Sequence, residues 1–403
     1  MPDRVEAMLG QMVEAGKIAG AVTLAWRDGR VTQSAAVGWR DMAAGQPLTR
    51  DALFRIASVS KPITSVTALT LLDEGRFTLD EPITRWAPEL AEMRVLRDPN
   101  GPLDQTDPAA RPITFRDLLT QRAGLSYADF QRGPLGRAYA EALGGAIDSE
   151  VAPDVWIAGL AALPLVDQPG ANFHYGHATD LLGLLLARME DMPLGEVMRR
   201  RLFDPLGMAD TGFAVPAAKR DRRARMYGFD DDGRPVEKVS TPAFMAERPE
   251  DMAFQSGGQG LWSTADDLLA FARLFIGGGA VDGVRILKPE TLALMTANQL
   301  DVAQRASARM FGMPILAAHG FGLGVAVVTD PAKAAPTLCK GAVGTVGWPG
   351  AYGGWWQADP VERSVMIFLA HNAMEPAQMA QGIGLDVYDA ISQFRAMADV
   401  TPA

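Results

Sequence analysis

The segment FRIASVSKP occupies residues 54–62, and apolar residues recur every third position over residues 63–72. This spacing predicts a helix that begins close to Ser58, with Pro62 tolerated because it falls in the first turn. Ser58 and Lys61 then share one helical face. A serine at a helix start lies near the positive end of the helix dipole, and an amine one turn later can accept its proton. The pair is a candidate nucleophile and base, although a capping serine and a surface lysine would show the same spacing.

Two further segments contain residues suited to the same chemistry. Residues 170–180, GANFHYGHATD, form a glycine-bearing loop that leads into a helix, and Tyr175 there could present its phenol to a serine hydroxyl. Residues 344–354, GTVGWPGAYGG, place glycines at the start of a strand, where a bare backbone N–H can approach a ligand oxygen. Taken singly, the first could equally be a core tyrosine and the second a bulged strand.

Composition excludes several classes of function. The chain has 403 residues, 48% of them hydrophobic, and a net charge of −10, which disfavours binding to nucleic acids and to anionic membranes. Cys339 is the single cysteine, so neither an internal disulfide nor a thiolate metal cluster can form. Acidic residues near the start and short apolar runs predict a cytoplasmic protein without a signal peptide or membrane span. The basic residues 219–225 are interpreted as a solvated face.

The order of the expected elements indicates how the chain is organised. Helices are predicted over 3–16 and 376–397, and strands over 21–26, 31–39, 321–328, 351–358 and 364–371. We therefore expect an α/β domain built from both termini, residues 1–75 and 305–403, with a helical domain over 76–304 and the active site at their interface. The irregular segments 97–112, 127–151 and 229–254 are expected to shape specificity.

The motifs together resemble a known group of enzymes. The serine-lysine pair, Tyr175 and the glycine-rich strand occur in the order and approximate spacing of the serine β-lactamase and penicillin-binding-protein superfamily. The segments LLTQRAGL at 118–125, FDPLGM at 203–208 and SGG at 256–258 extend the likeness over roughly residues 5 to 395. The match resembles most closely the class C β-lactamase-like carboxylesterases, known as family VIII esterases. It implies an antiparallel sheet flanked by terminal helices, with an inserted helical domain.

This resemblance implies a catalytic mechanism without a cofactor or metal. Ser58 would attack an ester carbonyl, and Lys61 and Tyr175 would share its proton as a general acid/base pair. The backbone N–H groups of Ser58 and Ala351 would form the oxyanion hole. An acyl-enzyme on Ser58 would then be hydrolysed by water.

Two departures from the lactamase pattern favour neutral ester substrates. Lactamases carry Lys-Thr-Gly on the edge strand, whereas this chain has WPG at residues 348–350, without the cation that would bind a lactam carboxylate. His177 replaces the asparagine that class C lactamases have two residues after the tyrosine. We expect Trp348, Gly350, His177 and Tyr127 to contact the substrate. No Gly-x-Ser-x-Gly elbow is present, which disfavours the α/β-hydrolase alternative.

The same scaffold is also compatible with other functions. A β-lactamase or D-amino-acid peptidase would act on amides, and an acyltransferase would prefer a small-molecule alcohol to water. A non-catalytic binding protein would have kept the fold without using the three residues. The expected partner is a small-molecule ester, with no nucleic acid and no membrane, and the chain is expected to be a monomer or a small homo-oligomer.

Overall fold

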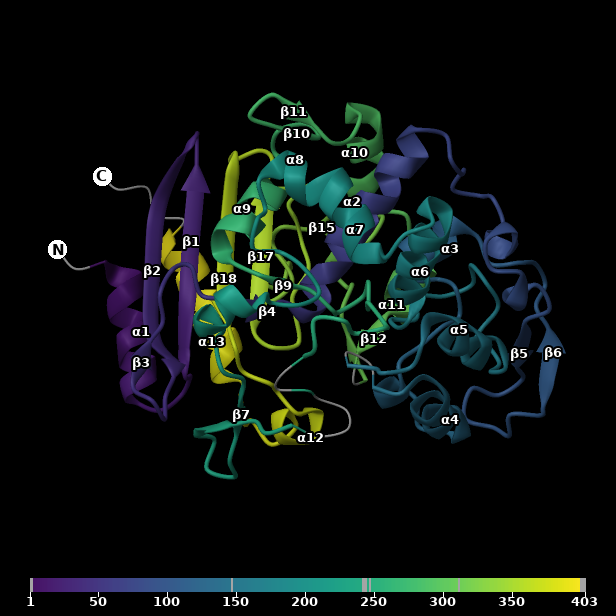
Figure 1. The fold of residues 1–403 in the computed structure, drawn as a ribbon, viewed down its shortest axis with the longest axis horizontal. Helices are drawn as coiled ribbons and strands as arrows, with labels where there is room; N and C mark the ends of the chain where they lie inside the picture. Colours follow the sequence, from purple (N-terminus) through teal and green to yellow (C-terminus); the bar gives the residue numbers. More distant parts are fainter. Residues whose placement is uncertain (1–2, 146–147, 241–244, 246–247, 311, 399–403) are drawn as a thin grey trace.

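An antiparallel sheet assembled from both ends of the chain forms the centre of one half of the molecule (Figure 1). The computed structural model describes residues 3–145, 148–240, 245, 248–310 and 312–398. The eight strands follow the order β14-β15-β16-β17-β18-β1-β2-β3, so the last strand of the chain pairs with the first. Ala21 lies opposite Ala370 in that pair, which brings the two terminal segments into one sheet.

The N-terminal elements agree with the predicted pattern. They are α1 (Arg4–Glu14), β1 (Gly20–Arg27), β2 (Arg30–Asp41) and β3 (Gln46–Pro47). Asp28 and Gly29 both have positive φ, 49° and 88°, which is the backbone conformation that a tight hairpin with an Asp-Gly turn requires. The helix and the two strands predicted over 3–16, 21–26 and 31–39 are confirmed.

The C-terminal elements are more broken than the sequence pattern suggests. They are β14 (His319–Phe321), β15 (Ala326–Val328), β16 (Val346–Gly347), β17 (Gly354–Asp359), β18 (Ser364–Ala370), α12 (Pro376–Met379) and α13 (Asp386–Ala398). The single strand predicted over 321–328 is wrong, because Gly324 at φ 92° turns the chain between β14 and β15. The single helix predicted over 376–397 is also wrong, because Gly382 and Gly384 adopt left-handed conformations between α12 and α13.

Helices cover both faces of the sheet. On one face Leu9 of α1 and Phe394 of α13 pack in one cluster with strand residues such as Phe368. On the other face Leu24 and Ile367 join a large core that includes α9 (Ala265–Ala272) and α2 (Ser60–Asp73). Residues 60–71 of α2 are all buried, so this helix runs through the interior of the protein.

The middle of the chain supplies the remaining helices and several short ladders. The helices are α3 (Phe115–Leu119), α4 (Pro134–Leu143), α5 (Pro153–Ala161), α6 (Ala178–Glu190), α7 (Leu194–Met198), α8 (Asp204–Leu206), α10 (Pro289–Thr296) and α11 (Val302–Ser307). The ladders pair β4 (Phe54–Arg55) with β9 (Trp262–Ser263), β5 (Arg94–Leu96) with β6 (Thr106–Pro108), β7 (Tyr227–Phe229) with β8 (Pro235–Glu237), β10 (Ala280–Val281) with β11 (Val284–Arg285), and β12 (Arg309–Met310) with β13 (Met313–Pro314). Helix α2 packs against α6, so the buried helix that follows the sheet strands contacts a helix from the middle of the chain.

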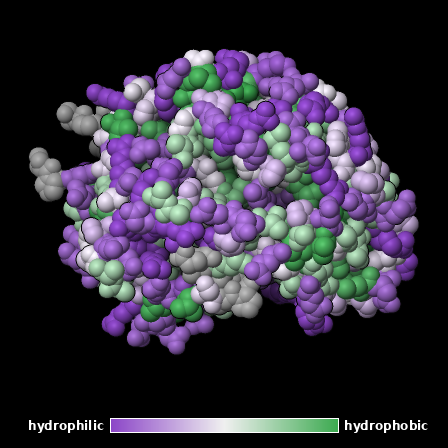
Figure 2. Space-filling view, viewed as in Figure 1, coloured by the Kyte–Doolittle hydropathy of each residue, from purple (hydrophilic) through white to green (hydrophobic). Residues whose placement is uncertain are grey.

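The visible surface is mainly hydrophilic, with small separate hydrophobic areas (Figure 2). Within the described part of the chain, none of the helices combines the length and the hydrophobicity that crossing a membrane requires. The fold class expected from the sequence, an antiparallel sheet with terminal helices and an additional helical region, is confirmed.

Candidate active site

Ser58 lies in a strained turn directly before the buried helix α2. It belongs to a short 3₁₀ turn, Ala57–Val59. The preceding Ala57 has a φ of 44°, a left-handed conformation that is uncommon for a residue with a side chain. Such strain persists where the surrounding structure enforces it, and it concentrates at functional sites. Ser58 is 6% exposed, so a substrate must reach its hydroxyl through a narrow opening or after a local movement.

Lys61 connects the serine to two other segments of the chain. Its Nζ lies 3.4 Å from Ser58 Oγ and donates hydrogen bonds to Tyr127 OH and to the Gly258 carbonyl, both at 3.0 Å. The side chain is 1% exposed. A lysine buried to this extent and surrounded by three oxygen atoms is not a surface residue. The alternative explanation of the serine-lysine spacing, a capping serine with a surface lysine, is therefore excluded.

Tyr175 meets Lys61 through its ring rather than through its hydroxyl. Lys61 Nζ lies 4.5 Å from the Tyr175 ring centroid, and the Tyr175 hydroxyl oxygen accepts a hydrogen bond of 3.0 Å from Trp348 Nε1. Trp348 is itself fully buried. The structure therefore brings together the serine, the lysine and the tyrosine named from the sequence, and it adds the indole as a donor to the phenol.

Tyr127 is the tyrosine whose hydroxyl contacts Lys61. The sequence indicated it as a substrate contact, whereas the structure places it inside the site, 5.7 Å from Tyr175 between ring centroids. Its hydroxyl also lies 3.5 Å from Asp180 Oδ2. Burial, the Asp180 charge and the neighbouring Tyr175 raise the pKa of the Tyr127 phenol well above its usual value. Tyr127 is therefore a neutral phenol at ordinary pH.

Asp180 is a residue that the sequence analysis missed. Its carboxylate accepts hydrogen bonds from Ser256 Oγ at 2.5 Å and from the Gly258 N–H at 3.0 Å, so it holds the backbone segment whose carbonyl contacts Lys61. Burial by itself raises the pKa of Asp180, but the hydrogen bond from His177 and the charge of Lys61 outweigh it, and the pKa lies below its usual value. An acidic residue in the first turn of α6, directly before the apolar run 181–187, was the available signal.

His177 contacts both Asp180 and Tyr127 and so helps to fix their positions. Its Nδ1 lies 3.0 Å from Asp180 Oδ2, and its ring packs edge-on against Tyr127 at 4.5 Å. The residue is buried, in contact with Trp156 as well. The other histidine of this loop, His174, contacts a different carboxylate, Asp167, at 3.2 Å. The two histidines are therefore held apart by separate partners.

The glycine-rich strand lies directly against the turn that carries the serine. A Cβ at Gly350 would stand 2.4 Å from the Ile56 carbonyl oxygen, so glycine is required for this close approach. The Gly350 N–H is already bonded to the Gly354 carbonyl at 2.7 Å, which gives this residue a packing role. The exposed Ala351 N–H has no acceptor among the described residues and is available to a ligand.

Gln121 is a second residue that the sequence analysis missed. Its backbone carbonyl accepts the His174 N–H at 2.8 Å, and its side-chain oxygen accepts the Gly176 N–H at 3.2 Å. These two bonds flank Tyr175 and fix the loop that carries it. Gln121 itself has a φ of 56° and is buried, so its position is strongly constrained. It belongs to the segment 118–125, which the sequence identified without assigning a role.

The comparison with protein families agrees with this fold and site. Residues 5–386 match the Beta-lactamase family model, and the chain belongs to that family. The chain is 46% identical to Protein Rv1367c of Mycobacterium tuberculosis (strain ATCC 25618 / H37Rv) over 367 residues, which cover 91% of this chain and 89% of that protein.

Two further comparisons indicate which kind of enzyme within the family this chain resembles. Esterase EstB of Burkholderia gladioli is 32% identical over 390 residues, covering 92% of this chain and 91% of the relative. The solved structure of "EstCE1, a hydrolase with promiscuous acyltransferase activity" has a TM-score of 0.77 and 28% identity, with 96% of this chain and 97% of that chain covered. The protein is a serine hydrolase that resembles the family VIII esterases.

Proposed function

We propose that the protein is a carboxylesterase that hydrolyses short-to-medium-chain esters through an acyl-enzyme on Ser58. The observation that carries this proposal is the buried contact of Lys61 with Ser58 Oγ at 3.4 Å, in a turn strained at Ala57. The named esterase EstB, similar over nine-tenths of both chains, supports the same reaction. The general chemistry is that of a serine activated by an adjacent base.

The two tyrosines have different roles in this proposal. Tyr127 is kept neutral by burial and by Asp180, so it positions Lys61 by accepting its hydrogen bond. Tyr175 is then the acid/base partner, because its oxygen accepts the Trp348 N–H and its ring faces Lys61. A hydrogen bond from a donor-only indole stabilises negative charge on the oxygen that accepts it.

The proposed reaction has two steps that balance in atoms and protons. Ser58 Oγ bonds to the carbonyl carbon, and its proton passes to the unit of Lys61 and Tyr175. The C–O bond of the ester breaks, and the same unit protonates the departing alcohol. Water then attacks the acyl-serine, gives its proton to that unit, and the carboxylic acid leaves with Ser58 restored. The N–H groups of Ser58 and Ala351 would bind the oxyanion in both steps.

The surroundings of the site favour neutral acyl groups. Aromatic side chains line its vicinity, with Trp348 packed against Tyr175 and Phe321 at ring distances of 5.3 Å, and Phe130 lying 6.0 Å from Tyr175. Residues 348–350 offer an indole, a proline and a glycine where a lactamase would offer a lysine. An uncharged acyl chain suits such an environment better than a carboxylate does.

The test compares two serine variants with nitrophenyl esters of increasing chain length. Ser58→Ala removes the nucleophile, and we expect ester hydrolysis to fall to the background rate and labelling by a fluorophosphonate probe to disappear. Ser34→Ala, an exposed serine of β2, is the matched control and should keep both. Retained hydrolysis by a folded Ser58→Ala protein would refute the assignment. Faster turnover of nitrocefin than of nitrophenyl butyrate would instead favour a lactamase.

Acyl transfer is the second candidate, because EstCE1 is described as a hydrolase with promiscuous acyltransferase activity. Both reactions share the acyl-enzyme and differ in the group that attacks it. Adding a primary alcohol during turnover separates them. Hydrolysis as the main function predicts that carboxylic acid stays the major product, whereas transfer predicts that a new ester replaces it.

A further inference from the structure

The Lys61 nitrogen has two oxygen acceptors besides the serine whose proton it shares in the proposed reaction. Its Nζ contacts Tyr127 OH and the Gly258 carbonyl, both at 3.0 Å, and lies 3.4 Å from Ser58 Oγ. A lysine accepts a proton as a neutral amine, which has two N–H bonds and one lone pair. Because Tyr127 and Gly258 can accept both N–H bonds, the lone pair remains for the Ser58 hydroxyl.

This arrangement requires the Tyr127 hydroxyl to act as an acceptor towards Lys61. A phenol oxygen has one proton to donate and lone pairs with which to accept. A hydrogen bond from the Gln259 side chain opposes the rise in the Tyr127 pKa that burial and Asp180 cause, so this amide donates to the oxygen. The ionised Asp180 carboxylate, 3.5 Å away, can only accept. The phenol proton therefore points to Asp180, and a lone pair faces Lys61.

The same carboxylate fixes the second acceptor, the Gly258 carbonyl. Asp180 Oδ1 accepts the Ser256 hydroxyl at 2.5 Å and the Gly258 N–H at 3.0 Å. On another side of this segment, Thr64 of α2 donates to the neighbouring Gly257 carbonyl at 2.6 Å. The SGG motif found in the sequence is thus held between α6 and α2, with one carbonyl directed at the lysine.

Glycine at position 258 allows these groups to come together. A Cβ there would lie 2.9 Å from Asp180 Oδ1 and 3.0 Å from Tyr127 OH. Side chains avoid contacts this short, so a methyl group would push the carboxylate and the phenol away from the backbone. Asp180, Tyr127 and Gly258 therefore occupy one closely packed space beside the lysine.

His177 holds the other oxygen of the carboxylate. Its Nδ1 lies 3.0 Å from Asp180 Oδ2, the oxygen that also faces the Tyr127 hydroxyl. Since a carboxylate can only accept, Nδ1 carries a proton. The His177 ring packs edge-on against Tyr127 at 4.5 Å, and the residue is 4% exposed. Both oxygens of Asp180 are thus fixed by buried donors.

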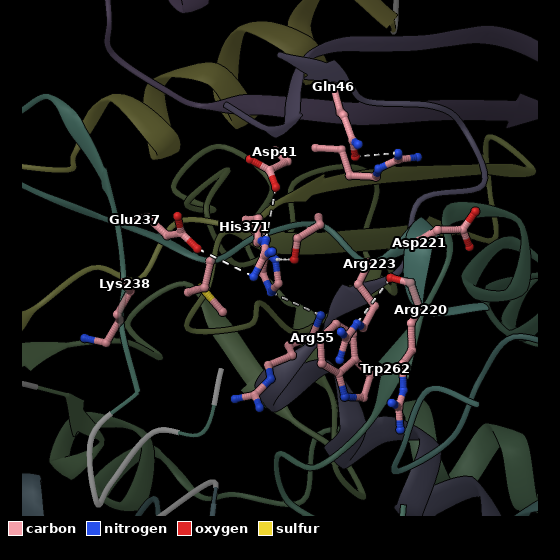
Figure 3. A pocket seen from close by; sticks show the side chains of 14 residues that line it. Asp41, Gln46, Arg55, Arg220, Asp221, Arg223, Glu237, Lys238, Trp262 and His371 are labelled. Atoms are coloured by element: carbon pink, nitrogen blue, oxygen red, sulfur yellow. Dashed lines mark hydrogen bonds and ion pairs between the residues drawn. The ribbon is translucent and has the colours of Figure 1, made fainter. Parts of the chain in front are cut away.

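The buried carboxylate on the other side of the serine turn has different partners. Asp148 lies between the guanidinium groups of Arg55 and Arg248, at 2.8 and 2.6 Å. Arg55 also lines a separate pocket together with His371 (Figure 3). Asp148 is therefore committed to two arginines, whereas Asp180 contacts the partners of the lysine.

We propose that Asp180 is a positioning residue, which fixes both acceptors of the Lys61 N–H bonds and thereby directs the lysine lone pair at Ser58. His177 supports this role by donating to the same carboxylate. The inference rests on the proposed function and deepens it, because the direction of the lone pair matters only if Ser58 is the nucleophile.

Asp180→Asn tests the direction of these hydrogen bonds. An amide keeps the shape of the carboxylate, but its NH₂ group must face either the Tyr127 oxygen or the Gly258 N–H. In the first case the phenol proton turns to the lysine lone pair, and in the second the Gly258 segment loses its acceptor. We expect kcat for nitrophenyl butyrate to fall roughly 10- to 100-fold, with KM changed by less than about two-fold.

Asp167→Asn is the matched control. Asp167 also pairs with a histidine, His174, at 3.2 Å, but its side-chain hydrogen bonds in the described part of the chain stay within residues 168–174. Its kcat should stay within about two-fold of the wild type. The rate at which a fluorophosphonate probe labels Ser58 should fall together with kcat in Asp180→Asn, and thermal unfolding shows that each variant is folded.

Tyr127→Phe combined with Asp180→Asn provides a second readout. Because the carboxylate acts through the phenol hydroxyl, the losses of the two single variants should not multiply. We expect kcat of the double variant to lie within about three-fold of the slower single variant. A merely structural role of Asp180 predicts that the two losses multiply, and that result would overturn the proposal.

His177→Phe tests the same carboxylate in case Asp180→Asn does not fold. It keeps a ring against Tyr127 and removes the N–H that faces Asp180, so we expect kcat to fall roughly three- to ten-fold. An unchanged kcat in the folded variants would overturn the proposal. Retained hydrolysis by Ser58→Ala would refute the proposed function itself, whereas an inactive Ser58→Ala with a normal Asp180→Asn would refute the positioning role alone.

Discussion

Two tyrosines contact the Lys61 side chain in different ways, and this difference is the main chemical feature at the scale of single residues. Tyr127 offers its oxygen at 3.0 Å, while Tyr175 offers its ring at 4.5 Å and keeps its oxygen for Trp348. The Tyr127 hydroxyl lies beside a carboxylate, that of Asp180. Among the hydrogen bonds of the described residues, the Tyr175 hydroxyl has no carboxylate partner. A phenol beside a carboxylate loses its proton less readily, so the two hydroxyls are not equivalent.

Removing each tyrosine hydroxyl should therefore have unequal effects. Tyr175→Phe removes the proposed proton carrier, and we expect kcat to fall by roughly 10²- to 10⁴-fold. Tyr127→Phe removes an acceptor that positions Lys61, and we expect a smaller loss, about ten-fold, with an altered pH profile. Steady-state kinetics with nitrophenyl butyrate over pH 6–10 measures both. A larger loss for Tyr127→Phe than for Tyr175→Phe would instead identify Tyr127 as the proton carrier and Tyr175 as the positioning residue.

Trp348 is expected to act through Tyr175. Trp348→Phe keeps an aromatic ring against Tyr175 and removes the hydrogen bond to its oxygen. We expect kcat to fall by roughly ten- to a hundred-fold, the effect of losing a hydrogen bond to a charged group, with KM little changed. The pH dependence of kcat should shift as well. If Trp348 only fills space, the rate and the pH profile would stay as in the wild type.

At the scale of elements, glycines let backbone segments approach closely enough to form the site. A Cβ at Gly176 would lie 2.3 Å from Ser126 Cα, so glycine allows the Tyr175 loop to pack on the segment that carries Tyr127. Gly350 has the same function between β17 and the turn before α2. Local backbone geometry positions Ser58 in the turn Ala57–Val59 and Lys61 at the start of α2, whereas these loops are positioned by contact with each other.

Gly176→Ala should therefore disturb the site more than the fold. The new methyl group would push the Tyr175 loop away from Ser126, and overpacking of this kind costs about 1–3 kcal/mol. We expect a loss of activity that exceeds the loss of stability. Gly228→Ala in β7 is the control, because nothing lies within 4 Å of its added Cβ. Equal activity of the two variants in nitrophenyl ester assays would show that the close approach is not needed.

At the scale of the whole molecule, a buried ion triad joins three distant segments. Asp148 contacts the Arg55 guanidinium at 2.8 Å and the Arg248 guanidinium at 2.6 Å, and all three side chains are at most 3% exposed. Burial by itself raises the pKa of Asp148, but the charges of Arg248 and Arg55 outweigh it, and the pKa lies below its usual value. The triad ties the segment that follows α4 to β4, next to Ser58. The segment 127–151, predicted to be irregular, thus contains helix α4.

Asp148→Asn should destabilise the protein strongly, by about 3–5 kcal/mol, because two guanidinium groups would lose their buried counter-charge. Since the folded pKa of Asp148 is depressed, its contribution is complete above the unfolded value of about 3.9 and is lost as pH falls through the folded pKa. Urea denaturation at pH 7 and near pH 3 measures this. Asp107→Asn is the control, because Asp107 pairs with Arg97 at the surface; it should lower the free energy of unfolding by less than about 1 kcal/mol. A similar small effect at Asp148 would contradict the prediction.

The domain boundaries near residues 75 and 305 and the cytoplasmic location stay predictions. Helix α9, from the stretch predicted to be helical and inserted, packs on the sheet and contacts β18 and β1. A helix from the middle of the chain therefore covers a face of the sheet, whereas the strands of the sheet come from both ends. Helical spacing shows that α9 has an apolar face, but it does not show which partner covers that face.

The catalytic segment was the part of the site most accessible to sequence reasoning. Ser58 and Lys61 are three residues apart at a helix start, so local geometry alone places them together. The glycine-rich strand and Tyr175 were found because motifs in a fixed order resemble a known family. Asp180 and Gln121 were missed because their roles rest on contacts with residues more than 50 positions away.

The sequence by itself determined the serine-lysine pair, the antiparallel terminal strands and an acidic chain without cysteine-based metal or disulfide chemistry. These features depend on composition and on spacings of two to four residues, which the backbone converts directly into local structure. The tertiary structure alone decided which tyrosine hydroxyl meets Lys61, and it placed Asp148 between the buried guanidinium groups of Arg55 and Arg248. Such contacts depend on how distant segments pack, and no short-range pattern specifies that packing.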